Sequence, residues 1–184
     1  MTRETAIELL DKYIKNDRMK NHCYASEAVL RALAERLGRD VEQWGLAGLL
    51  HDIDVEITDS DPKRHALEAV PILEEAGMDP ESIEAIKMHN EEASGIPRSR
   101  EFHHALAAGE TITGLIVATT LVYPDQKLAS VKPKSVVKRM KQKAFAASVS
   151  RDTIRECEEI GIPLPEFAEI SIIAMRGISE QIGL

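Results

Sequence analysis

The chain has 184 residues, of which 43% are hydrophobic, 29% are charged and only 4% are aromatic, and its formal net charge is −8. This composition is typical of a single globular domain with an aliphatic core, and the negative charge argues against broad binding to nucleic acids or anionic membranes. Because the chain has only Cys23 and Cys157, begins with the charged segment "MTRETAIELLDKYIKND" and lacks an apolar run of about 20 residues, we expect a cytoplasmic protein without a membrane segment.

Helical periodicity dominates the first part of the chain and predicts an all-α fold. We expect helices over about 2–14 and 19–37. Asp40, with Gln43 three residues later, is typical of a capping box and predicts a third helix that ends near His51.

Proline and aspartate mark the next helix starts. Asp61-Pro62 and Asp79-Pro80 each place an N-cap residue before a proline, so they should open the fourth and fifth helices. Pro71 should kink the fourth helix. Further helices are expected over about 99–122, 135–147 and 151–160 and after Pro165.

Polar residues fall on apolar faces of five consecutive predicted helices. They are His22, the pair His51-Asp52, His65, His89 and Glu110. A single buried histidine is usually satisfied by a carbonyl or a water molecule, but one cation at the crossing of these helices would satisfy all of them. Imidazole and carboxylate groups suit Zn, Mn, Fe or Ni. His103 shares the face of Glu110 and is a weaker candidate, as is His104, whereas Cys23 should lie in the core.

The order His22, His51-Asp52 and a later carboxylate resembles the HD superfamily of metal-dependent phosphohydrolases, whose signature is H…HD…D on an all-helical fold. Five stretches are similar to the small stand-alone HDIG-type predicted hydrolases: "GLLHDID", "KRHALEAVPILEEAG", "IKMHNE", "ETITGLIVATTLV" and "KSVVKRMKQKAFAASVSRD". The resemblance implies one HD-domain helical bundle over residues 1–184, with a C-terminal helical extension from about 125 to 184.

The resemblance also implies the ligand set. It places the four family ligands on His22, His51, Asp52 and Glu110. The last position departs from the family pattern, because this chain reads "ETITG" where the family has an aspartate in a segment like "DELTG". His65 and His89 resemble the histidines that hold a second metal in the HD-GYP branch, although that branch has two adjacent histidines where this chain has His89-Asn90.

The implied activity is hydrolysis of a small phosphate ester, with a nucleotide as the first expectation, by a hydroxide generated on a divalent Mn, Ni, Fe or Zn ion. Asp52 could bridge two ions. With one ion, His65 or His89 could orient the water or protonate the leaving oxygen. The alternative is a degenerate HD domain that binds metal or nucleotide as a regulatory module, and Glu110 is the sequence feature that favours it.

A basic stretch, "VKPKSVVKRMKQKAF", stands out in this acidic chain. Lys134, Lys138 and Lys141 fall on one face of its predicted helix, which is either a solvated surface or a rim that binds the phosphorylated substrate. Apart from Phe145 the stretch has no aromatic residue for base stacking, so we expect no long nucleic acid as a partner.

Overall fold

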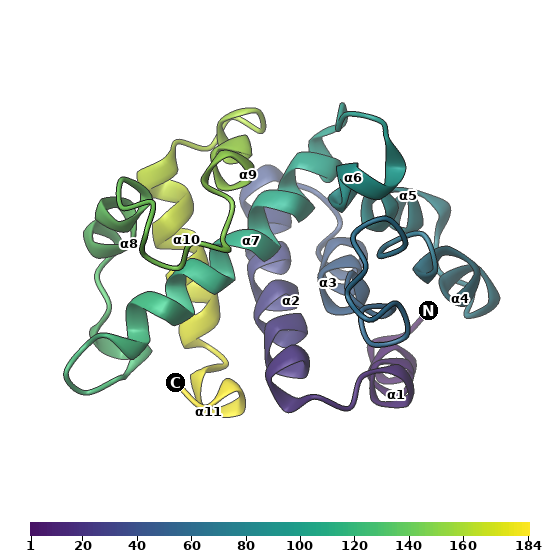
Figure 1. The fold of residues 1–184 in the computed structure, drawn as a ribbon, viewed down its shortest axis with the longest axis horizontal. Coiled ribbons are helices and arrows are strands. Elements are labelled where there is room, and N and C mark those ends of the chain that lie inside the picture. Colours follow the sequence, from purple (N-terminus) through teal and green to yellow (C-terminus); the bar gives the residue numbers. More distant parts are fainter.

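The computed structural model describes all 184 residues, and every regular element in it is helical (Figure 1), which confirms the all-α prediction. The helices of the first half are α1 (Arg3–Tyr13), α2 (Asp17–Leu37), α3 (Val41–Leu50), α4 (Ala69–Glu75), α5 (Pro80–His89) and α6 (Glu91–Ser94). Those of the second half are α7 (Glu101–Leu121), the 3-10 helix η1 (Leu128–Ser130), α8 (Pro133–Met140), α9 (Arg151–Arg155), the 3-10 helix η2 (Glu156–Glu158), α10 (Leu164–Arg176) and α11 (Ser179–Ile182). No helix has the length and apolar character needed to cross a bilayer.

Local capping sets most helix boundaries where the sequence predicts them. The Asn16 side chain accepts hydrogen bonds from the first amides of α2, and Gly38 ends that helix with a left-handed φ of 67°. Asp40 and Asp79 cap α3 and α5 in the same way, each through the amide three residues later. These boundaries depend on contacts within one turn, which the sequence carries.

The fourth helix begins later than predicted. Asp61 does start a turn, and its carbonyl accepts from the His65 amide at 2.9 Å. Ala66 then takes a left-handed φ of 74°, which interrupts the helix. The α4 helix starts at Ala69, whose amide donates to the Asp54 carboxylate at 3.0 Å. Pro71 therefore lies in the first turn of α4, where it has no preceding turn to kink, and that prediction is wrong.

The basic helix is also shorter than predicted. The α8 helix ends at Met140 and turns follow it to the start of α9. These turns surround the guanidinium of Arg151, which donates to the carbonyls of Ala146 and Val149 at 2.7 and 2.6 Å. The segment predicted as a helix over 151–160 is divided into α9 and η2. Side-chain contacts across several turns decide this region, so helical periodicity alone does not predict it.

Helix α2 lies at the centre of the molecule and packs against α3, α7 and α10. Figure 1 shows α3, α4 and α5 on one side of α2, and α8 and α10 on the other. Two glycines permit close approach to α2: a Cβ at Gly48 of α3 would lie 2.7 Å from the Ser26 carbonyl oxygen, and one at Gly109 of α7 would lie 2.7 Å from Leu30 Cδ2. One hydrophobic core runs from Ala6 to Ile182 and includes the helices that follow α7.

Candidate metal centre

Four histidines and one aspartate converge beside α2, at the end of α3. The Nε2 atoms of His22 and His51 lie 3.1 Å apart, and those of His65 and His89 also lie 3.1 Å apart. Asp52 stands between the two pairs. Its Oδ2 is 3.5 Å from His22 Nε2 and 3.4 Å from His51 Nε2, whereas its Oδ1 is 3.1 Å from His65 Nε2 and 3.6 Å from His89 Nε2. The result is two ligand triads that share Asp52: His22, His51 and Asp52 form the first triad, and Asp52, His65 and His89 form the second triad.

Each imidazole ring is held through its other nitrogen. Nδ1 of His51 contacts the Gly48 carbonyl oxygen, and Nδ1 of His89 contacts the Ile86 carbonyl oxygen. Nδ1 of His65 contacts the Asp54 carboxylate. Nδ1 of His22 contacts the Thr113 hydroxyl. A carbonyl or carboxylate oxygen only accepts, so Nδ1 is the donor in the first three contacts. Nε2 is then the atom that each ring directs at the centre, as is usual for metal-binding histidines.

Asp54 and Thr113 are the residues that the sequence did not assign to the site. Asp54 is fully buried and accepts from His65 Nδ1 at 2.7 Å, so it fixes the orientation of that ring. Thr113 donates its hydroxyl proton to the Glu110 carbonyl at 2.6 Å and therefore accepts from His22 Nδ1 at 3.0 Å. The sequence signal for Asp54 was its place two residues after Asp52, but its partner lies eleven residues further along the chain.

Burial and neighbouring charges shift the pKa values of the triad residues in different directions. Burial lowers the pKa of His51 to about 3, so its imidazole is neutral. Burial also acts to lower the pKa of His65, but hydrogen bonds to Asp52 and Asp54 outweigh it and raise that pKa to about 10. Although burial disfavours the charged form of Asp52, the adjacent histidines hold the pKa of its carboxyl well below the ordinary value. Asp52 is therefore the fixed negative charge of the centre.

The first triad fits a divalent cation. His51 is neutral with its proton on Nδ1, and Thr113 accepts from Nδ1 of His22, so with both rings neutral two nitrogen lone pairs face each other at 3.1 Å. Their repulsion is relieved when both nitrogens bind one cation. Two imidazole nitrogens and a carboxylate oxygen suit Zn, Mn, Fe or Ni. The second triad offers the same set of donor atoms, the Nε2 atoms of His65 and His89 and Oδ1 of Asp52.

Glu110 lies at the edge of the first triad. Its Oε2 is 3.7 Å from His22 Nε2, and its other oxygen accepts from the Thr111 hydroxyl. It belongs to neither of the two tight triads. Burial raises the pKa of the Glu110 carboxyl, so a nearby cation would stabilise its charged form. Its role as a ligand remains a prediction.

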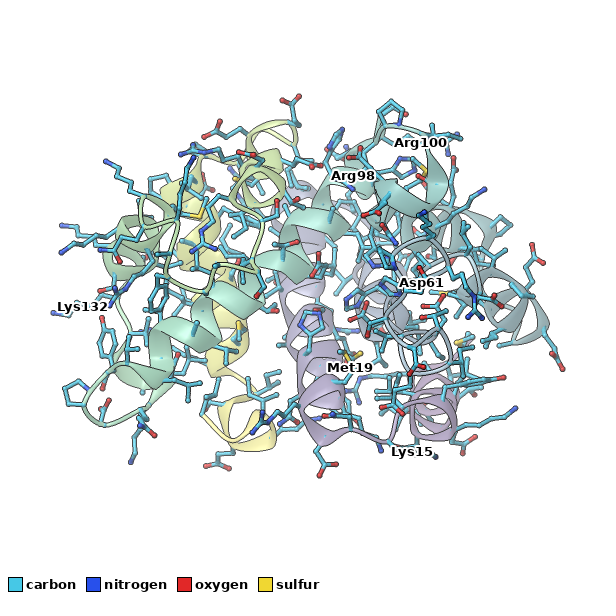
Figure 2. All side chains as sticks on the ribbon, viewed as in Figure 1. Lys15, Met19, Asp61, Arg98, Arg100 and Lys132 are labelled. Carbon is cyan, nitrogen blue, oxygen red and sulfur yellow. The ribbon has the colours of Figure 1, made fainter.

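The other candidate residues lie away from the centre. His103 is buried with its Nε2 3.9 Å from Glu84, and His104 Nδ1 contacts Glu156 at 2.7 Å. Lys134, Lys138 and Lys141, which were predicted to form a substrate-binding rim, line a separate groove between α8 and α10. Glu166 and Glu169 line the same groove. Figure 2 shows Lys132, which precedes α8, on the opposite side of the molecule from Asp61. Asp61 belongs to the segment between Asp52 and His65, which carries part of the centre. The structure does not bring these lysines and the histidines together.

Comparison with known families gives one match. A family model described as HD domain matches residues 19–120. This span contains every residue of both triads and also Glu110, and it ends inside α7. Comparisons with curated proteins and with solved structures give no significant match.

Proposed function

The chain belongs to the HD domain family, and we propose that it is a metal-dependent phosphohydrolase that acts on a small phosphate ester. One observation supports the proposal above all others: two triads of imidazole nitrogens and carboxylate oxygens share Asp52 within a few ångströms. Such an arrangement suits two ions that act on one phosphoryl group.

The residues of this chain have separate tasks in the proposed reaction. His22, His51 and Asp52 would hold the first ion, and Asp52, His65 and His89 would hold the second. When bound, a divalent cation supplies a water molecule of lowered pKa and polarises a phosphoryl oxygen. Asp54 and Thr113 keep the rings of His65 and His22 in position, which pre-organises the centre.

His65 has a second task in protein that holds only the first ion. Its ring is fixed by Asp54, and its Nε2 faces Asp52 at the centre. From this position Nε2 can donate a hydrogen bond to the oxygen of the leaving group and then transfer its proton. The residue acts as ligand or as acid, depending on how many ions are present.

The alternative function is a regulatory module that binds metal or nucleotide without turnover. The position of Glu110 outside the two tight triads favours this alternative. A nucleotide is the substrate that the sequence resemblance suggests, and cyclic dinucleotides belong in the same screen because of the similarity to the HD-GYP branch.

The test is hydrolysis of a panel of phosphate esters by protein loaded with Mn, Ni, Fe or Zn. The Asp52→Asn variant is the matched control, because it keeps the shape of the side chain and removes the shared charge. Turnover by the parent protein and none by Asp52→Asn would support the phosphohydrolase. Metal binding with no turnover of any ester would favour the regulatory module.

A further inference from the structure

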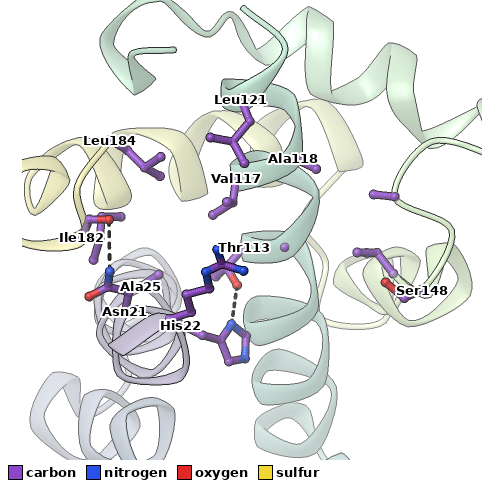
Figure 3. Close-up of a pocket in the computed structure, with 14 residues that line it drawn as sticks. Asn21, His22, Ala25, Thr113, Val117, Ala118, Leu121, Ser148, Ile182 and Leu184 are labelled. Atoms are coloured by element: carbon purple, nitrogen blue, oxygen red, sulfur yellow. Dashed lines mark hydrogen bonds between the residues drawn. The ribbon is translucent and has the colours of Figure 1, made fainter. Parts of the chain in front are cut away.

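A pocket of about 640 Å³ opens beside His22, between α2, α7, the turn at 146–149 and the C-terminal residues (Figure 3). Figure 3 shows Val117, Leu121 and Leu184 grouped toward one end of this pocket and His22 with Thr113 toward the other. We call this cavity the His22 pocket. Its volume is in the range of small-molecule sites.

The His22 pocket adjoins the first triad through His22, which belongs to both. The side chains of His22, Glu110 and His65 are 25%, 18% and 16% exposed, whereas that of His51 is only 1% exposed. His22 is therefore the most exposed residue of the centre, and a phosphate ester can approach from its side. With its phosphoryl group at the centre, the rest of the molecule can extend into the pocket.

The walls of the His22 pocket are aliphatic. Eight of its fourteen lining residues are hydrophobic, and none of these has an aromatic ring. The Asn21 amide, which also lines the pocket, already donates to the Ile182 carbonyl at 3.3 Å. A nucleobase is usually recognised by ring stacking and by free hydrogen-bonding groups. An aliphatic group matches these walls better.

Arg18 is the one lysine or arginine among the residues that line the pocket. Arg18 lies one helical turn before His22 on α2, and its side chain lines the pocket. The other arginines of the chain each make a side-chain hydrogen bond or an ion pair. Arg18 makes neither. Arg18 is an exposed residue, and His22 is the one residue of the two triads that lines the pocket with it.

We propose that the His22 pocket binds the organic part of the phosphate ester, and that this part is an aliphatic chain with an anionic substituent, a carboxylate or a second phosphate, which pairs with Arg18. The inference rests on the proposed function, because it requires the phosphoryl group at the metal centre. Arg18 and the pocket walls then determine specificity.

The test is calorimetric binding of non-hydrolysable phosphonates to metal-loaded protein, which needs no turnover. The probes are methylphosphonate, butylphosphonate, and butylphosphonates with a terminal carboxylate or a terminal phosphonate. Each methylene that enters the pocket should tighten binding about fourfold. A terminal anion should add about tenfold or more through charge-assisted hydrogen bonds to Arg18. The carboxylate and phosphonate probes distinguish the two substituents.

Two variants separate the parts of the proposal. Arg18→Gln should abolish the gain from the terminal anion and leave the preference for butylphosphonate over methylphosphonate. Ala118→Phe fills the pocket wall, so it should weaken butylphosphonate and leave methylphosphonate unchanged. Arg36→Gln is the matched control, because Arg36 lies at the other end of α2 and pairs with Glu166 at the surface. Arg36→Gln should leave the affinity for every phosphonate probe unchanged.

Several results would overturn the inference. Equal binding of methylphosphonate and butylphosphonate would show that the pocket is not used. Tighter binding of adenosine monophosphate than of every butylphosphonate would exclude the aliphatic assignment. Equal weakening of all probes by Arg18→Gln would place Arg18 on the phosphoryl group. If even methylphosphonate did not bind, the proposed function itself would fail, and the inference with it.

Discussion

His22 and His51 direct their Nε2 atoms at each other across 3.1 Å, and when both rings are neutral the hydrogen bonds at the Nδ1 atoms leave a lone pair on each Nε2. His22 lies on α2 and His51 directly follows α3, 29 positions later in the sequence. Packing of α3 against α2, permitted by Gly48, brings them together. A protein that folds around two opposed lone pairs is built to hold a cation between them.

We therefore expect the purified protein to carry at least one transition metal per chain. Removal of the metal should lower the melting temperature by several degrees, because an ion present at 100 times its Kd stabilises the folded state by about 2.7 kcal/mol. Elemental analysis and thermal unfolding before and after chelation measure both effects. A metal-free protein whose stability ignores added Mn, Ni, Fe and Zn would contradict the metal centre.

Substitutions in the two triads should have different effects on metal stoichiometry. His51→Ala should abolish binding at the first triad, and His89→Ala should abolish binding only at the second triad. Asp52→Asn should weaken both, because the shared charge is lost. Titration calorimetry with Mn measures the number of ions bound. If His51→Ala kept its full metal content, His51 and Asp52 would be an ordinary buried pair and not metal ligands.

The sequence predicted the candidate ligands better than it predicted their surroundings. Helical phase identified His22 and His89, because each lies on one face of a regular helix. The segment that carries His65 was predicted incorrectly: Asp61-Pro62 was expected to open a helix there, but Ala66 interrupts it, and Asp54 reaches forward to the amide of Ala69. That contact depends on the folded chain, and no local pattern encodes it.

The Arg98 guanidinium connects the second triad to the C-terminal helices. Only 6% of its side chain is exposed, and it donates to the carbonyls of Met88 and His89 at 3.2 and 3.0 Å and to both oxygens of Glu156. It thereby fixes the end of α5, where His89 lies. Arg98 and Glu156 are thus positioning residues for the second triad.

Arg98→Lys should destabilise the protein by about 1–3 kcal/mol, because a single ammonium cannot replace the forked guanidinium contacts. It should also weaken metal binding at the second triad and leave the first triad unchanged. Denaturant unfolding and calorimetric titration measure the two effects. Arg36→Lys is the control, since that exposed pair contributes at most about 1 kcal/mol. Equal loss of affinity at both triads would indicate general destabilisation and not positioning.

Three lysines on α8 and directly after it test the hypothesis that they form a substrate-binding rim. Because their groove is separate from the centre, and charges beyond about 8 Å are screened at physiological salt, replacing all three with alanine should change KM less than about twofold. The variant is Lys134→Ala, Lys138→Ala and Lys141→Ala in one chain. Steady-state kinetics at low and physiological salt measure the effect. A large rise in KM that becomes smaller with added salt would instead support the hypothesis that these lysines bind the substrate.

Glu110 gives the sharpest test, because the family has aspartate at its position and this chain has the longer residue. Gly109 allows α7 to lie close against α2, and from that backbone the Glu110 carboxylate reaches within 3.7 Å of His22 Nε2. We expect the longer side chain to complete the first triad once an ion is bound, since a buried carboxylate without a cation is costly.

Glu110→Gln keeps the shape of the side chain and removes its charge, so it should weaken metal binding at the first triad by about 10–100-fold and lower turnover with it. Binding at the second triad should not change, which separates a lost ligand from a loosened fold. Thr111→Val is the matched control: it removes only the hydroxyl that donates to the carboxylate, and it should have a smaller effect in the same direction. If Glu110→Gln binds metal as tightly as the parent protein, the carboxylate is not a ligand, and the regulatory module becomes the better explanation of this departure from the family.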